Sequence, residues 1–337
     1  MGRYLPRIAA DNLPESVIVG AGYAWAALMV VLGLTNLVIA FGTAAPPPPM
    51  ASVYETVRRM DMSDLPPLQR YTARDGASLA YRAWPGGGER VAILIHGSTG
   101  SSRSMNPLAK ALGAAGATVY APDMRGHGES GRRGDIDYLG QLDDDLADFI
   151  AALKPQHPAA RFTLIGFSAG GGFTLRIAAG RYGDLFDRYI LLAPYLGYNA
   201  PSSRHGGGGW ATPYMPRIIA LAILNRVGVH SFEGLPIVAF ARRPDPKEPV
   251  PTYSFRLALS FAPHLDFRDD FRKVRKPMAL LVGSADDQML ADQYAPLLQS
   301  LRPDIPVQVI PGIGHIDLTA DPAALEAIRT VFVADAR

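Results

Sequence analysis

The sequence predicts an α/β fold, in which a mostly parallel central sheet has helices on both faces, with one inserted segment and an N-terminal transmembrane helix. Short apolar runs rich in branched residues recur along the chain, and each has the length of a strand buried on both faces. Helical patterns separate most of these runs, and such alternation is typical of parallel sheets. The 337 residues suffice for one large domain of this kind and an additional segment.

The charge balance and the lack of cysteine exclude several function classes. Lysine and arginine number 33 against 31 aspartates and glutamates, so there is no basic excess for a phosphate backbone and we expect no nucleic-acid partner. Without cysteine the chain has no disulfides, thiolate nucleophiles or thiolate metal sites. The sequence also lacks a His-Glu-x-x-His motif and a phosphate-binding loop, so we expect neither a metal nor a cofactor.

The first element along the chain is an apolar run from Val17 to Phe41 without a charged residue. A helix of about 20 apolar residues crosses a bilayer, whereas the apolar part of a secretory signal has about 7–15. We therefore expect a tail at 1–16 and a transmembrane helix at 17–42. A cleaved signal and a helix of a soluble domain are the alternatives.

A linker is expected at 43–67, between the membrane and the globular domain. Its four consecutive prolines, 46–49, cannot extend the preceding helix because each lacks an N–H group. They favour an extended spacer, which a short helix around 53–60 interrupts.

The globular domain is expected at 68–335. It opens with two strands around the turn pair Asp75-Gly76. Buried strands are predicted at 91–95, 117–121, 161–167, 189–193, 278–283 and 307–310. The helical pattern at 138–153 has its leucines and Phe149 on one face, and its three aspartates, 143–145, are expected to be solvated. Residues 195–269 show no regular alternation and contain many prolines, so we expect an insertion there, placed over the edge of the sheet.

Ser168 is the candidate nucleophile. It is the centre of Gly166-Phe167-Ser168-Ala169-Gly170, which follows a predicted buried strand and precedes a helical pattern. This context is that of the nucleophile elbow, where a sharp strand-to-helix turn raises the hydroxyl above the sheet. The small residues on either side let neighbouring backbone approach.

His315 is the candidate general base among the seven histidines. It lies downstream of the serine, in a glycine-rich loop after the last predicted strand, and catalytic residues collect at the carboxyl ends of such strands. The others follow earlier strands, precede a strand or fall in the irregular segment: His96, His127, His157, His205, His230 and His264.

The orienting acid should lie between the serine and the histidine in chain order. Asp286 and Asp287 end a predicted strand, and either carboxylate could accept the imidazole Nδ1–H. We favour Asp286 and keep Asp287 as the alternative.

An oxyanion hole needs two N–H donors aimed at the developing charge. Ala169, directly after the nucleophile, is expected to supply one. The other is expected from the loop His96-Gly97-Ser98-Thr99-Gly100, with Ser98 as the first choice and Thr99 as the alternative.

Taken together, these motifs resemble the α/β-hydrolase superfamily, in particular its lysophospholipase and monoacylglycerol-lipase-like members. The resemblance covers about residues 68–335 and depends on five motifs in order: His96-Gly97, Asp123 to Ser130, Gly166 to Gly170, Gly283 to Asp286, and Gly314-His315. It implies the α/β-hydrolase fold, with a substrate-covering cap at 195–269. It also implies that the segment around His127 shapes a loop beside the catalytic centre and does not react.

Three functions are compatible with these features. The first is a membrane-anchored serine hydrolase that cleaves carboxylic esters, with acyl lipids favoured because the anchor holds the domain near them. The second is a peptidase, aminopeptidase or amidase of the same fold. The third is a non-catalytic, membrane-bound interaction protein on a hydrolase scaffold. The expected partners are therefore a small-molecule or lipid ester and, through residues 17–42, the membrane.

Overall fold

An eight-stranded sheet forms the centre of the protein. The structure is a computed structural model that describes residues 19–26, 29–30, 33, 39, 41–241 and 252–334. The strand order is β1-β2-β4-β3-β5-β6-β10-β11, and every pair from β4 to β11 is parallel, whereas β2 is antiparallel to both of its neighbours. The strands are β1 (Gln69–Thr72), β2 (Ser78–Trp84), β3 (Arg90–Ile95), β4 (Thr118–Pro122), β5 (Arg161–Phe167), β6 (Arg188–Leu192), β10 (Met278–Gly283) and β11 (Val307–Ile310). The predicted mostly parallel sheet is thus confirmed.

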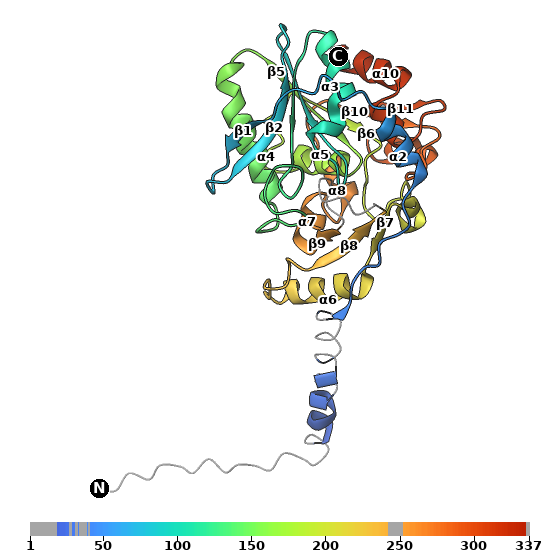
Figure 1. Cartoon of the computed structure of the whole chain (residues 1–337). Helices are drawn as coiled ribbons and strands as arrows, with labels where there is room; N and C mark the ends of the chain where they lie inside the picture. Colours follow the sequence, from blue (N-terminus) through green and yellow to red (C-terminus); the bar gives the residue numbers. More distant parts are fainter. Residues whose placement is uncertain are drawn as a thin grey trace, which may run out of the picture.

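Helices cover both faces of this sheet (Figure 1). On one face α3 packs against α10, and on the other α5 packs against α8, which in turn contacts α9. The helix α4 contacts β1 at the antiparallel edge. Their bounds are α3 (Asn106–Ala114), α4 (Gln141–Leu153), α5 (Ala169–Ala179), α8 (Phe267–Lys273), α9 (Tyr294–Leu301) and α10 (Pro322–Val333).

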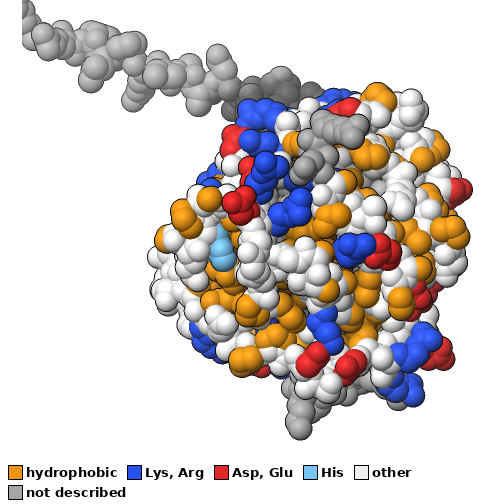
Figure 2. All heavy atoms as spheres, turned by 90° about the horizontal axis from the view of Figure 1, so that it is seen from above, with side chains coloured by type: hydrophobic (Ala, Val, Ile, Leu, Met, Phe, Trp, Pro, Cys, Tyr) orange, Lys and Arg blue, Asp and Glu red, His pale blue; other side chains and the backbone are white. Residues whose placement is uncertain are grey.

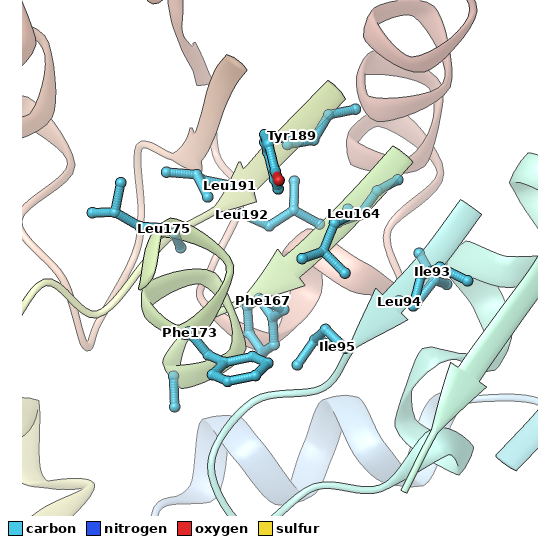
Figure 3. Close-up of a cluster of buried hydrophobic side chains, with 14 of the residues drawn as sticks. Ile93, Leu94, Ile95, Leu164, Phe167, Phe173, Leu175, Tyr189, Leu191 and Leu192 are labelled. Atoms are coloured by element: carbon cyan, nitrogen blue, oxygen red, sulfur yellow. The ribbon is translucent and has the colours of Figure 1, made fainter. Parts of the chain in front are cut away.

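The core lies on both sides of the central strands, which is why these strands read as continuous apolar runs. Figure 3 shows side chains of β3, β5 and β6 converging with Phe173 and Leu175 of α5. All five residues from Val91 to Ile95 are buried. Burying one such leucine or isoleucine stabilises the fold by about 1.5–3 kcal/mol, so the sheet that positions the site is held firmly.

The aspartates of α4 are not on a solvated face, and the prediction for 143–145 was wrong. Asp144 and Asp145 are buried, and Asp143 is mostly covered. Asp145 accepts two hydrogen bonds from Arg125, at 2.7 and 2.8 Å, and Asp143 pairs with Arg176 at 2.9 Å. The reason is that arginines from other elements compensate the buried charges, and no local sequence pattern reveals such partners.

The segment between β6 and α8 forms a small layer of its own across one end of the sheet (Figure 1). Three short antiparallel strands, in the order β7-β8-β9, pack with two helices. The elements are β7 (Ala211–Pro213), α6 (Met215–Arg226), β8 (Pro236–Phe240), β9 (Thr252–Ser254) and α7 (Phe255–Ser260). No pattern in the sequence predicts these strands, because they have only three to five residues and two of them contain proline. We call this layer the cap.

The expected transmembrane helix, 17–42, falls in part on residues outside the described part of the chain. The described positions of the run, 19–26, 29–30, 33, 39 and 41, are helical. Within the described residues no helix combines the length and the apolar character that crossing a bilayer requires. Farther along, the expected linker contains one helix, α2 (Ala51–Arg59), which packs on the loop after β11.

Charges of both signs are interspersed on the end of the molecule away from α6, which Figure 2 shows from above. This distribution agrees with the near balance of 33 basic and 31 acidic side chains. The face seen there offers no surface of a single charge to a polyanion.

Candidate active site

Ser168 lies in the turn between β5 and α5, in a backbone conformation that L-residues rarely adopt. Its φ is 54° and its ψ −118°, and such strain costs on the order of 1–3 kcal/mol. A Cβ at Gly166 would lie 2.1 Å from the carbonyl oxygen of Gly170, and one at Gly170 would lie 2.4 Å from that of His96. The two glycines therefore make the sharp turn possible, and the turn places the hydroxyl at the carboxyl end of the sheet.

The structure brings Ser168, His315 and Asp286 into one hydrogen-bonded chain. His315 Nε2 is 3.0 Å from Ser168 Oγ, and His315 Nδ1 is 2.7 Å from Asp286 Oδ2. All three side chains are buried, with Ser168 only 5% exposed. A carboxylate only accepts, so Nδ1 carries the hydrogen and Nε2 is left to accept the proton of the serine hydroxyl. This arrangement can activate the hydroxyl for nucleophilic attack.

Asp286 and Asp287 point to different partners, although they are adjacent in sequence. The second oxygen of Asp286, Oδ1, accepts the backbone N–H groups of Gln288 and Met289, at 2.8 and 2.6 Å. Both oxygens are thus engaged, which fixes the carboxylate against the imidazole. Asp287 instead accepts a hydrogen bond of 2.7 Å from Ser52 of α2. The structure therefore places Asp286 beside the histidine and Asp287 outside the triad.

The two predicted oxyanion donors belong to the helix that begins directly after the serine and to the loop that passes beside it. Ala169 is the first residue of α5, and the first N–H groups of a helix have no partner within it. The loop after β3 passes close to the nucleophile, because a Cβ at Gly97 would lie 3.3 Å from Ser168 Cβ. Thr99 donates its N–H to the hydroxyl of Tyr253 at 2.7 Å, so this group is already engaged. The geometry favours Ser98 over Thr99 as the second donor.

The cap covers this site with two aromatic residues that the sequence reasoning missed. Trp210 donates its indole N–H to Ser98 Oγ at 2.8 Å, and Tyr253 contacts the next residue of the loop. Trp210 and Phe240 also pack together, with ring centroids 5.9 Å apart. Buried aromatic residues in the irregular segment were the available signal, but nothing in their spacing indicates what they contact.

Two further histidines are buried near the site, and their hydrogen bonds join the neighbouring loops and, for His127, the hydroxyl of Tyr253 in the cap. His96 Nε2 accepts the N–H of Met124 at 3.2 Å, and its Nδ1 is 2.8 Å from Gly97 O. Burial lowers the pKa of His127 well below its usual range, and it lowers the pKa of His96 as well. Both rings are therefore neutral near pH 7 and act as fixed hydrogen-bonding groups.

The remaining histidines have partners away from the serine. His157 pairs with Tyr120, His230 with Glu233 and His264 with Asp270, at 2.8, 2.7 and 2.7 Å. The side chain of His205 is outside the described part of the structure. Among the described residues no group of three or more histidines and carboxylates could hold a metal ion.

A cavity of about 230 Å³ lies between α2 and the loop 99–104. Val57, Met60, Thr99 and Asp123 are among the residues that line it, and Ser168 is not. This space therefore borders the oxyanion loop but not the reacting hydroxyl. At the site itself Ser168 is only 5% exposed, and Trp210 and Tyr253 of the cap contact the loop beside it.

Comparison with known proteins identifies the family to which the chain belongs. The family model of serine aminopeptidases, S33, matches residues 88–322. The monoacylglycerol lipase of Mycolicibacterium smegmatis is 32% identical over 122 residues, which are 35% of this chain and 43% of that protein. Human monoglyceride lipase is 28% identical over 183 residues, 53% of this chain and 56% of that protein. The chain thus spans about half the length of these two relatives.

Solved structures show the same fold. A soluble variant of monoglyceride lipase from Saccharomyces cerevisiae, in complex with a substrate analogue, superposes with a TM-score of 0.60 at 18% identity, over 82% of this chain and 97% of that one. The monoacylglycerol lipase of Paleococcus ferrophilus gives 0.58 at 22% identity, over 76% and 98%. The predicted α/β-hydrolase fold is therefore confirmed.

Proposed function

This chain belongs to the serine aminopeptidase S33 family of α/β-hydrolases, and from that premise we propose that it cleaves carboxylic esters of acyl lipids through an acyl-enzyme on Ser168. The observation that carries the proposal is the buried chain of hydrogen bonds from Ser168 through His315 to Asp286. These hydrogen bonds join the nucleophile, the base and the orienting acid that acyl transfer requires.

In the proposed reaction His315 Nε2 takes the proton of Ser168 while Oγ bonds to the ester carbonyl carbon. The N–H groups of Ser98 and Ala169 stabilise the oxyanion of the tetrahedral intermediate. Asp286 holds the imidazolium through Nδ1–H. The imidazolium then returns its proton to the departing alcohol, and the acyl group stays on Ser168. Water, activated by the same imidazole, releases the acid and restores the serine.

An ester substrate is favoured over a peptide by the relatives, and the carboxylate of the triad is not available to a substrate ammonium group. The mycobacterial and human relatives are both described as lipases of monoacylglycerols. An aminopeptidase needs a carboxylate to bind the free ammonium group of its substrate. Asp286 cannot do so, because both of its oxygens are engaged within the triad.

The test is a comparison of substrates in the purified full chain. We expect p-nitrophenyl esters, monoacylglycerol and lysophospholipid to be hydrolysed, with rates that rise with acyl chain length, and aminoacyl p-nitroanilides to be left intact. Ser168→Ala supplies the background rate. Cleavage of the anilides without the esters would make the chain a peptidase. Inertness toward all of these substrates would favour the non-catalytic interaction protein.

Anchoring in a membrane through residues 17–42 is part of the same proposal, and the surface of the cap supports it. Residues four apart on α6 and at its C-cap form an apolar stripe that faces solvent: Met215, Ile219, Ile223 and Val227 are 42, 55, 60 and 69% exposed. The apolar run meets the domain beside this helix, where Arg217 donates a hydrogen bond of 2.9 Å to the carbonyl oxygen of Ile39 (Figure 1). A bilayer that holds the run would also cover the stripe.

Extraction of membranes tests the anchor. The full chain should stay in the membrane pellet after washing with sodium carbonate at high pH. Arginines in place of Met29 and Val30 should release it, because each costs about 2.5–3.5 kcal/mol at the centre of a spanning helix. Release of the unsubstituted chain by carbonate would argue against an anchor and leave the ester hydrolase proposal unaffected.

A further inference from the structure

The cap and the oxyanion loop are joined through one buried hydroxyl. Tyr253 of β9 is only 3% exposed. Its hydroxyl accepts the N–H of Thr99 at 2.7 Å and lies 2.5 Å from His127 Nε2. The tyrosine belongs to the cap, whereas Thr99 follows β3 and His127 follows β4. A single cap residue therefore contacts two loops at the carboxyl end of the sheet.

The hydrogens in this network have one consistent direction. His127 Nδ1 is 3.3 Å from the carbonyl oxygen of Arg125, which can only accept, so Nδ1 carries the hydrogen. The neutral ring then accepts at Nε2, and Tyr253 donates to it. Burial beside His96 keeps His127 neutral by lowering its pKa, so this direction holds near pH 7. The hydroxyl oxygen is thereby oriented to accept the N–H of Thr99.

A second cap residue holds the neighbouring residue of the same loop. Trp210 donates to Ser98 Oγ at 2.8 Å. Thr99 itself has a φ of 60°, which is a genuine outlier for a β-branched residue and costs on the order of 1–3 kcal/mol. Such a conformation persists only when surrounding contacts maintain it. Among the described residues of the cap, Tyr253 and Trp210 both make contacts of this kind with the loop.

We propose that Tyr253 and Trp210 are positioning residues, through which the closed cap holds the oxyanion loop so that Ser98 N–H points at the reacting carbonyl. The inference rests on the proposed function, because it assigns a role within the same reaction. The geometry of the oxyanion hole then depends on contacts between the loop after β3 and the cap. Opening of the cap admits the substrate and frees the loop, and closure restores the donor beside Ser168.

Tyr253→Phe tests this role with little change of shape. The ring stays, but Thr99 N–H and His127 Nε2 lose their shared partner. Removing one oxyanion donor outright lowers kcat about 10²–10³-fold, and a misdirected donor should have a smaller effect. We expect kcat for a p-nitrophenyl ester to fall about 10–100-fold, with KM changed less than about twofold. A matched control is Tyr81→Phe on β2. It removes a hydroxyl that donates a hydrogen bond of 2.8 Å to Gln69 of β1, and it should leave kcat unchanged.

A second readout separates positioning from mere loss of structure. The rate constant for phosphonylation of Ser168 by a fluorophosphonate also depends on the oxyanion hole, but it needs no ester turnover. It should fall in Tyr253→Phe by a factor similar to that of kcat, while the melting temperature shows that the protein is folded. Trp210→Phe should show the same pattern, and it provides the test if Tyr253→Phe fails to fold.

The outcomes distinguish this inference from the proposed function. Labelling and turnover of both cap variants within twofold of wild type would overturn the positioning role alone. A wild-type chain that is labelled but cleaves no ester would overturn the proposed substrate, and the labelling rates would still decide the role of Tyr253. A wild-type chain that is not labelled would overturn both.

Discussion

Replacing Ser168 by alanine is expected to lower kcat for ester hydrolysis by about 10⁶-fold and to abolish labelling by a fluorophosphonate. Without the hydroxyl no acyl-enzyme forms, and His315 has no proton to take from the position 3.0 Å away. Alanine is smaller than serine and fits the same buried space, so the fold should persist. The measurement is kcat on a chain-length series of p-nitrophenyl esters, together with in-gel fluorescence of the labelled protein.

Ser300→Ala is the matched control for this substitution. Ser300 lies on α9 and donates a local hydrogen bond of 2.8 Å to the carbonyl oxygen of Leu297. Its loss should leave labelling and kcat at the wild-type level. If Ser168→Ala were labelled as strongly as wild type, another residue would be the nucleophile and the assigned reaction would be wrong.

The substitution Asp286→Asn should lower kcat by about 10⁴-fold without unfolding the protein. The amide has nearly the same shape, but its NH₂ group can donate to His315 Nδ1, which the carboxylate cannot do. The imidazole would then carry its hydrogen on Nε2 and could not accept the proton of Ser168. The measurement is the pair kcat and KM, and KM should change little because the carboxylate does not face the substrate.

The neighbouring residue provides the control for that prediction. Asp287→Asn removes the same charge one position along the chain, where the partner is Ser52 of α2 at 2.7 Å. An exposed hydrogen bond of this kind contributes at most about 1 kcal/mol to stability, and kcat should stay within about twofold of wild type. A large loss in Asp287→Asn with little effect in Asp286→Asn would assign the orienting acid to Asp287.

The elements of the domain were largely predictable from local pattern. Each predicted single-run strand, from 91–95 to 307–310, appears with ends within one residue of the expectation. All of these strands except β11 at the edge of the sheet are largely buried on both faces, so their sequences are mostly apolar and stand out from their surroundings. The strands of the cap have three to five residues and are partly exposed, so no such contrast marks them.

The candidate site likewise has residues that local sequence predicted and residues that it did not. Ser168 stood out because a strand, a sharp turn and a helix must follow one another there, and His315 because it lies in the glycine-rich loop after the last strand. The choice between Asp286 and Asp287 depended on which carboxylate faces His315. The role of Tyr253 depended on its contact with Thr99, which lies 154 residues away along the chain. The partners of the α4 aspartates were hidden for the same reason.

The sequence by itself determined the fold class, the strands of the sheet and the turn that presents the serine, because each of these follows from residues close together in the chain. The tertiary structure alone decided which aspartate meets the histidine, which loop donor is engaged, and that the cap contacts the oxyanion loop. Hydrogen bonds between distant segments require specific distances and directions, and these exist only after the sheet has brought the loops to one end of the molecule.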